Sequence, residues 1–447
     1  MLTLRLPNLK GDLFATAVSF GAQAAIRLGA SLILTRILRP EAYGIIAIVT
    51  SIGYVVALLG DIAVTVSLVR HEQGESASYL NTAWTLRLGR SLLNTALMFF
   101  AAPLIADVYH AAELVQPLRA YSLWFLIAAF ESMSFPLAVR RRNSRIIVYS
   151  ELATNAIATI FSLLYCYYTR TYWGMIYGIL LNRLLMTAMS YAFYRDVRPR
   201  LMIDRGAARE LLRFTRYAVP SSLVTIGMNQ FDKAIFLRLF DLHLLGVFSL
   251  AGSIAAPVDG LINKVAQLVL YPRCAHDFRT APQRFALRYY TRNTNLYISI
   301  LALPAAIGGA AQLLIRLLYD PRYIQAGAIL EAFMVRSALL SLAGAAECML
   351  LAAGELQAQL QGNIVRAISV VVGTLAGYFL AGLMGFVYGA ALSVLPQLLF
   401  YLWLQGRKGF LMLRYEVYKV LFVVATFVLA YLVSHLLLTL FPIRHRI

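Results

Sequence analysis

Charged residues are scarce in this chain. Asp, Glu, Lys and Arg make up 14% of its 447 residues, whereas an ordinary soluble domain contains about 25%. Apolar residues reach 60%, and several long stretches carry almost no charge. A transmembrane helix needs about 20 consecutive, mostly apolar residues. The composition therefore excludes a soluble globular protein and predicts a polytopic membrane protein.

The sequence also lacks the motifs that indicate an enzyme or a metal protein. Its three cysteines form no CxxC pair, so we expect neither a disulfide framework nor a zinc site. It contains no GxxxxGK[ST], HExxH or GxSxG motif of the kind that carries nucleotide, zinc or serine-hydrolase chemistry. We therefore expect no catalytic residues, no metal ion and no cofactor.

Positive charge is in excess, with a net charge of +19 from 40 basic and 21 acidic residues. In a soluble protein this balance would suggest nucleic acid as a partner. Here the basic residues form short clusters between apolar segments, which is typical of positively charged cytoplasmic loops. We therefore expect membrane lipids as partners and no nucleic acid.

Hydropathy predicts thirteen membrane-spanning helices, near residues 13–35, 43–67, 84–106, 116–138, 147–168, 172–194, 214–237, 243–270, 290–315, 325–352, 359–381, 384–404 and 417–440. With this topology, 26 of the 40 basic residues, Arg87 and Lys419 among them, belong to loops and span ends on the side of the N-terminus, and nine to the other side. This split predicts a cytoplasmic N-terminus. The N-terminus lacks the design of a signal peptide, so the first segment is expected to be retained as a span.

The chain is predicted to consist of two similar halves. Residues 33–44 align with residues 235–246 at a constant offset of 202, which places Arg36 on Arg238 and Gly44 on Gly246. The predicted fold is therefore an all-α polytopic membrane protein of two six-helix lobes, related by a pseudo-twofold axis along the membrane normal, with 12–14 spans in total. The predicted domains are an N-terminal lobe at 1–194, a basic cytoplasmic linker at 195–213, a C-terminal lobe at 214–405 and an additional transmembrane segment at 406–447.

Ionisable residues within the spans are costly, by at least about 2.5–3.5 kcal/mol for a central Arg, Lys or Asp. Each should face protein, water or substrate, and Arg183 and Arg336 are expected in the interior. Arg27 has two open interpretations, a cavity or an acid on another helix. Lys264 is expected at the depth of Asp61, either as its salt-bridge partner or as a cation for an anionic ligand. Internal ion pairs are favoured for three acids: Asp232, Asp259 and Glu347.

Several segments resemble one family of membrane transporters. The stretch from Asn229 through Asp232 and Lys233 to Gly252, followed by Tyr271-Pro272, resembles the start of the second lobe in polysaccharide flippases. Residues 59–70, which include Asp61, resemble the second span of that family, and residues 38–44 fit its short first outside turn. From about residue 11 to about residue 405, the chain resembles the Wzx-type branch of the multidrug/oligosaccharidyl-lipid/polysaccharide (MOP) exporter superfamily.

The resemblance implies a function. A protein of this branch would move an undecaprenyl-pyrophosphate-linked sugar repeat unit from the cytoplasmic to the periplasmic leaflet of the bacterial inner membrane by alternating access. A polysaccharide polymerase and chain-length proteins are further candidate partners. With Arg183 added from the buried-charge argument, the candidate substrate-binding cations are Arg27, Arg183, Lys233, Lys264 and Arg336. The candidate coupling or ion-pair carboxylates are Asp61, Glu131 and Asp232.

Two alternative functions remain open at this stage. A cation-coupled multidrug exporter of the same superfamily would use a membrane carboxylate such as Asp61 or Glu131 as its ion site, although the interior cations make a cationic drug an unfavourable cargo. A membrane enzyme of polysaccharide assembly is the third hypothesis, and no catalytic motif supports it.

Overall fold

The computed structural model describes residues 9–59, 67–68, 71, 74–141, 143–194, 199–213, 235–236 and 238–440. The chain divides into two compact units, Met1–Gly246 and Val247–Ile447. Within the described residues every regular element is a helix. Among the described residues, eight helices are long and apolar enough to cross a membrane, and two bent helix pairs bring the number to as many as ten. The predicted all-α polytopic membrane protein is confirmed, while the predicted lobe boundaries and pseudo-twofold axis stay predictions.

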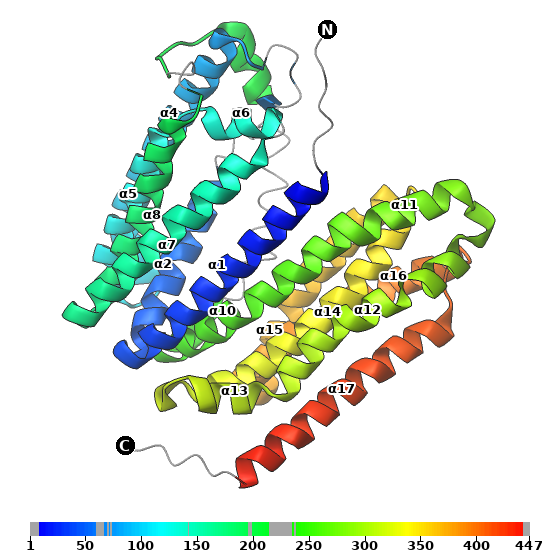
Figure 1. The fold of residues 1–447 in the computed structure, drawn as a ribbon. Coiled ribbons are helices and arrows are strands. Elements are labelled where there is room, and N and C mark those ends of the chain that lie inside the picture. Colours follow the sequence, from blue (N-terminus) through cyan, green and yellow to red (C-terminus); the bar gives the residue numbers. More distant parts are fainter. Residues whose placement is uncertain are drawn as a thin grey trace. The chain divides into compact units, whose positions relative to one another are not determined.

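The first unit is a bundle of apolar helices (Figure 1). α4 packs against α5, α7 against α1 and α8, and α5 also against α8. The predicted span at 116–138 is broken, because α5 and α6 meet at an angle of 59°. The helices of this unit include α1 (Leu9–Ile37), α2 (Pro40–Leu59), α4 (Ala77–Val108), α5 (Val115–Ala129), α6 (Ser134–Arg140), α7 (Ser144–Thr169) and α8 (Trp173–Ala192). Most of the predicted span at 214–237 lies outside the described residues.

The second unit contains most of α10 and the helices that follow it along the chain. α14 lies at its centre, because it contacts α11, α12, α13, α15 and α16. α12 and α13 meet at 61° and together form one candidate span. The helices are α10 (Leu242–Val265), which begins in the first unit, α11 (Tyr271–Thr280), α12 (Phe285–Gly309), α13 (Ala311–Leu318), α14 (Ala326–Ala352), α15 (Leu356–Leu392), α16 (Leu395–Arg407) and α17 (Leu413–Leu440). A π-helical turn at Ala266–Leu270 joins α10 to α11.

α15 folds back on itself. Ala381 and Gly382 have non-helical backbone angles, and Gly382 has a φ of +58°, a conformation that glycine adopts without strain. The two halves then approach so closely that a Cβ at Gly377 would collide with the carbonyl oxygen of Gly385. The fold-back accounts for the two separate predicted spans at 359–381 and 384–404, since the second half of α15 continues toward α16.

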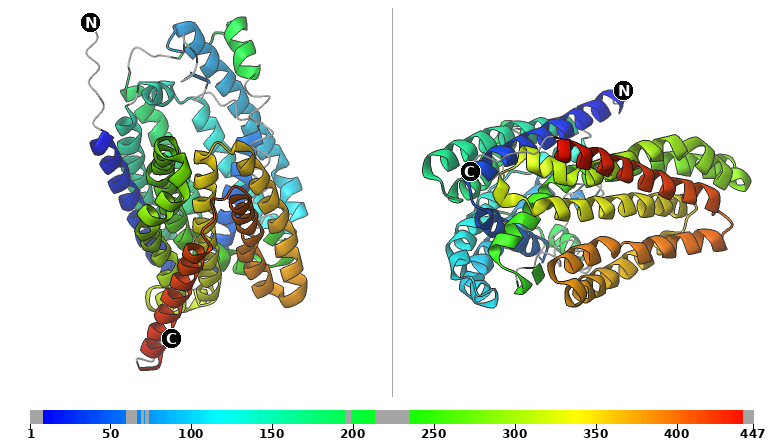
Figure 2. Two further views of the ribbon diagram at one scale, coloured as in Figure 1. Left: turned by 90° about the vertical axis from the view of Figure 1, so that its right-hand side faces the viewer. Right: turned by 90° about the horizontal axis from the view of Figure 1, so that it is seen from below.

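α17 runs along α12 at the edge of the second unit (Figures 1 and 2). The contact is close at a glycine, because a Cβ at Gly309 would collide with the carbonyl oxygen of Phe427. Ser434 Oγ donates a hydrogen bond of 3.0 Å to the carbonyl oxygen of Gly309. Only 6% of the most apolar window of α17 is buried in the protein. The helix is therefore attached along one narrow face.

The start of α2 and the start of α10 cross at two glycines. A Cβ at Gly44 would collide with the carbonyl oxygen of Leu242, and a Cβ at Gly246 would collide with that of Pro40. Under the offset of 202, Gly44 corresponds to Gly246 and Pro40 corresponds to Leu242. The two close approaches are therefore reciprocal, since the glycine of each repeat copy rests on the carbonyl of the other copy.

Candidate functional site

Three charged side chains converge where α5 breaks from α6. Glu131 lies in the break itself, Arg87 on α4 and Arg183 on α8. Arg183 Nη2 lies 2.5 Å from Glu131 Oε2, and Arg87 Nη1 lies 3.6 Å from Glu131 Oε1. The side chains of Glu131, Arg87 and Arg183 are 9%, 13% and 21% exposed. Two largely buried arginines thus share one carboxylate, and we call these three residues the Arg87–Glu131–Arg183 cluster.

The same cluster also supplies hydrogen-bond donors to the backbone carbonyl oxygens of the break. A broken helix leaves carbonyl oxygens without intrahelical partners, and at membrane depth these must be bonded elsewhere. The carbonyl oxygen of Glu131 accepts hydrogen bonds from Arg87 Nη2 and from Trp84 Nε1, the latter at 3.1 Å. Arg87 Nη2 also lies 3.4 Å from the carbonyl oxygen of Ser132. Arg87 therefore contacts both the carboxylate and the backbone of the break.

Serine hydroxyls join the break to the end of α8. Ser132 donates its backbone N–H to Ser190 Oγ at 2.9 Å and its hydroxyl to the carbonyl oxygen of Ser190 at 2.6 Å. Ser134 Oγ donates to the carbonyl oxygen of Phe193 at 3.0 Å. These bonds do not involve the carboxylate of Glu131. The conformation of the break therefore does not depend on the Glu131 carboxylate alone.

An aromatic ring also contacts Arg183. Its guanidinium lies 4.8 Å from the ring centroid of Trp124, within the range of a favourable cation–π contact. Trp124 in turn stacks on Tyr121 with ring centroids 6.2 Å apart. Arg90 and Arg183 both add positive potential at Arg87. The cluster thus presents positioned guanidinium groups with an excess of positive charge, which is the chemistry that binds an oxyanion.

The second unit holds a different set of buried charges. Arg336 Nη2 on α14 lies 3.7 Å from Asp259 Oδ2 on α10, and Ser337 Oγ donates a short hydrogen bond to Asp259 Oδ1. Arg366 on α15 interacts electrostatically with Arg336, Asp259 and Glu347. Two arginines are therefore set against two carboxylates, and this group is balanced.

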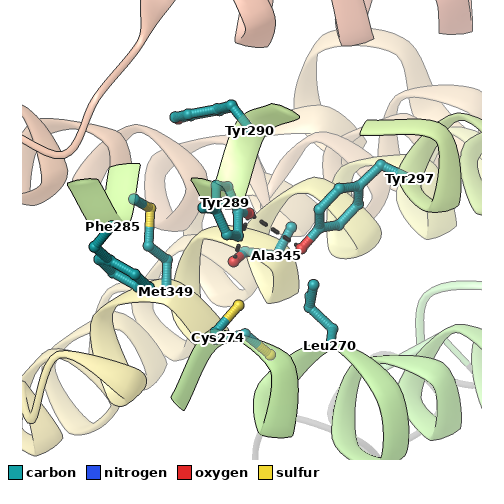
Figure 3. Packing of buried hydrophobic residues seen from close by; sticks show 9 residues of the cluster. Leu270, Cys274, Phe285, Tyr289, Tyr290, Tyr297, Ala345 and Met349 are labelled. Carbon is teal, nitrogen blue, oxygen red and sulfur yellow. Dashed lines mark hydrogen bonds between the residues drawn. The ribbon is translucent and has the colours of Figure 1, made fainter. Parts of the chain in front are cut away.

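A second balanced pair anchors α17. Lys419 Nζ lies 2.8 Å from Glu416 Oε1, and its side chain is 1% exposed. The ammonium lies over the rings of Tyr289, Tyr290 and Tyr297, at 5.5, 5.0 and 4.6 Å from their centroids. Tyr290 donates its hydroxyl to Glu416 at 2.9 Å. Figure 3 shows the packing of these tyrosines on α12 and the hydrogen bond of 3.1 Å from Tyr289 to Tyr297.

The structure brings together two of the residues singled out from the sequence. Arg183, a predicted substrate cation, and Glu131, a predicted carboxylate, form one ion pair, while Arg336 is paired with an acid of its own unit. Arg27 is exposed on α1 and Lys264 is half-buried on α10. Their roles in binding stay predictions. Three further predicted residues lie outside the described residues: Asp61, Asp232 and Lys233.

Sequence reasoning missed Arg87 and Lys419, which it counted with the cytoplasmic loops and span ends. The structure buries both side chains. A signal was present in each case. Arg87 follows Trp84 at a spacing of three residues on one helix, and Lys419 follows Glu416 at the same spacing, so each pair lies on one helix face. A basic residue that shares a face with an aromatic or acidic residue is a candidate for the interior.

Known proteins resemble the chain in sequence. Residues 33–327 match the family described as polysaccharide biosynthesis protein. The chain is 24% identical to the amylovoran biosynthesis protein AmsL of Erwinia amylovora over 68% of its own length and 79% of that protein. It is 23% identical to the succinoglycan biosynthesis transport protein ExoT of Rhizobium meliloti over 54% of its own length and 48% of that protein.

Solved structures share the fold. The lipid II flippase MurJ in an inward closed conformation superposes with a TM-score of 0.62, at 11% identity, over 95% of this chain and 96% of that chain. An inward-facing multidrug resistance transporter of the MATE family, from the MOP superfamily, gives a TM-score of 0.65 at 15% identity over 88% and 98% of the two chains. These similarities show the fold of the chain, and they include both a flippase and a drug transporter.

Proposed function

Because the chain belongs to the polysaccharide biosynthesis protein family, we propose that it is a flippase for a lipid-linked oligosaccharide. It would carry an undecaprenyl-pyrophosphate-linked repeat unit of a surface polysaccharide or exopolysaccharide from the cytoplasmic to the periplasmic leaflet by alternating access. The observation that carries this proposal is the family match over residues 33–327, which reaches from α1 to the beginning of α14.

The charge of the first unit supports an anionic cargo. A pyrophosphate that crosses a low-dielectric layer without compensating charge is strongly unfavourable, and arginine contacts recover much of that free energy. The Arg87–Glu131–Arg183 cluster holds two arginines for one carboxylate. A cationic drug would be repelled by such a cluster. A multidrug exporter is therefore the less favoured alternative, although the fold itself is compatible with both functions.

We further propose that the protein acts without catalysis in the bacterial inner membrane, with its N-terminus in the cytoplasm. The excess of basic residues on the side of the N-terminus supports this orientation. A polysaccharide polymerase and chain-length proteins would act on the repeat unit after transfer, and they are the proposed protein partners.

The proposal is tested by deleting the gene in a host without a paralogue. Cells should stop exporting one polysaccharide while lipid-linked repeat units persist on the cytoplasmic side. Polymer in the medium or on the surface is quantified together with extracted lipid-linked sugars, and the wild-type gene on a plasmid should restore both. Normal polymer export in the deletion strain would contradict the proposal.

A further inference from the structure

The Arg87–Glu131–Arg183 cluster carries more positive charge than its own acid can neutralise. The carboxylate of Glu131 carries one negative charge, and it is paired with the guanidinium groups of both Arg87 and Arg183. In the described part of the chain, no second acid contacts Arg87 or Arg183. Charges at membrane depth are costly unless they are compensated by an opposite charge or by water. The cluster is therefore suited to receive a further negative charge.

The two arginines also have hydrogen-bond donors to spare. Within the described residues, the Nε atoms of Arg87 and Arg183 are buried and donate to no acceptor. A guanidinium has five N–H donors in a planar fork that matches the oxygens of a carboxylate or phosphate. An oxyanion with two or three oxygens would supply both the missing charge and the missing acceptors.

From these observations, and on the basis of the proposed function, we propose that Arg87 and Arg183 bind an oxyanion of the substrate, and that Glu131 occupies its place when no ligand is bound. The oxyanion is either a phosphate of the lipid carrier or the carboxylate of an acidic sugar, and both have the same arginine-binding chemistry. Arg87 and Arg183 would be substrate-binding residues. Glu131 would be an internal competitor for the oxyanion, and it would compensate part of their positive charge when no ligand is bound.

The position of Glu131 allows such an exchange. Residue 131 lies between α5 and α6 rather than within either helix, so its side chain can change partner without the loss of a helical turn. The break remains bonded to α8 through Ser132 and Ser134. The carbonyl oxygen of Glu131 also keeps its bond from Trp84. Loss of the Glu131 carboxylate should therefore alter the charge of the site more than its architecture.

The test uses the full chain purified in detergent, with inorganic pyrophosphate and glucuronate as separate probes. Binding is measured as the dependence of the thermal unfolding midpoint on probe concentration. At least one probe should stabilise the wild-type protein. Glu131→Gln should bind that probe about tenfold more tightly, because an internal competitor has been removed. Arg183→Gln and Arg87→Gln should lose the effect.

Arg183→Gln is expected to fold, because Glu131 then keeps Arg87 as its partner and the buried charges balance. Arg183→Lys, which retains the charge but not the fork, should bind with intermediate affinity. Arg322→Gln is the matched control. It also removes one positive charge, but from an ion pair with Asp320 in which Arg322 is 40% exposed, and it should leave probe binding unchanged.

Each outcome has a defined meaning. Stabilisation by pyrophosphate assigns the site to the carrier phosphates, and stabilisation by glucuronate alone assigns it to an acidic sugar. The proposal is overturned if neither probe stabilises the wild-type or Glu131→Gln protein, if Arg183→Gln binds as the wild type does, or if Glu131→Gln binds no more tightly. Probe binding does not require transport. Normal export in the deletion strain would therefore reject the flippase proposal while leaving a measured anion site in place.

Discussion

The two units differ in the balance of their buried positive and negative charges. In the first unit, Arg87 and Arg183 share the single carboxylate of Glu131. In the second unit two described groups of buried charge are matched: Arg336 and Arg366 lie with Asp259 and Glu347, and Lys419 lies with Glu416. A matched set joins helices and leaves no charge for a ligand, whereas a surplus of one sign is available to an anion. The comparison therefore places the candidate anion site in the first unit.

Two arginines make this comparison direct. The side chains of Arg183 and Arg336 are 21% and 22% exposed, and Arg183 is paired with Glu131 and Arg336 with Asp259. Each also lies over an aromatic ring, Arg183 over Trp124 at 4.8 Å and Arg336 over Phe333 at 4.6 Å. A second arginine lies near each acid, Arg87 beside Glu131 and Arg366 near Asp259, but only Arg366 also interacts with a second carboxylate, that of Glu347. Effects of substituting these two residues should therefore separate a ligand-binding arginine from a structural one.

The largest expected effect is on export by Arg183→Gln. This variant should reach the membrane at the wild-type level and fail to export polymer, since the remaining Arg87–Glu131 pair is neutral. Arg336→Gln should instead lower thermal stability by about 3–5 kcal/mol, because it leaves the Asp259 carboxylate buried without its cation. Polymer yield, the amount of protein in the membrane and the unfolding midpoint are measured for each variant.

Double variants complete this first test. Addition of Glu131→Gln to Arg183→Gln should not restore export, whereas addition of Asp259→Asn to Arg336→Gln should restore most of the lost stability. Recovery of export in the first double variant would make the Arg183–Glu131 contact a structural ion pair like the one in the second unit. The contrast between the units would then fail.

A smaller effect, on stability, is expected at the anchor of α17. Lys419→Met should destabilise the purified protein by about 3–5 kcal/mol, because Glu416 would remain buried without its cation. The combination with Glu416→Gln should recover part of the loss. Arg414→Gln on the same helix is the control, since an exposed substitution changes stability by about 0.5 kcal/mol at most. A Lys419→Met protein as stable as the wild type would show that this pair does not attach α17.

The smallest effect is expected at the close helix crossings, in which the two units are alike. Gly246→Ala in the first unit and Gly309→Ala in the second should each destabilise the protein by about 1–3 kcal/mol, because the new methyl group meets backbone that cannot move aside cheaply. Gly29→Ala is the control, because a Cβ there has open space. Equal unfolding midpoints for all three variants would show that these crossings tolerate a wider separation.

Much of the fold was predictable because each membrane-spanning segment must by itself be long and apolar enough to cross the hydrocarbon core. The predicted segments at 147–168 and 325–352 coincide closely with α7 and α14. The bends were not predictable. The predicted span at 116–138 is two helices joined at Glu131, and its hydropathy is the same whether the backbone is straight or broken. Serine bonds to α8 support that break, and such bonds depend on contacts between helices.

The site was predictable only in part. Arg183 and Glu131 were identified separately because a charge in an apolar segment is conspicuous in any sequence. Arg87 was assigned to a span end, because its hydropathy context does not show that Glu131, 44 residues further along the chain, lies beside it. Lys419 was likewise counted with a span end, although tyrosines from another helix surround it.

The sequence by itself determined that this protein crosses the membrane many times, which family it resembles and which charges must avoid lipid. These properties follow from the composition of each segment, since every span exchanges water for hydrocarbon independently of the others. Only the tertiary structure decided which charges are neutralised. Arg336 is matched by Asp259 and Arg183 shares Glu131 with Arg87, because ion pairs between distant residues exist only after the helices have packed.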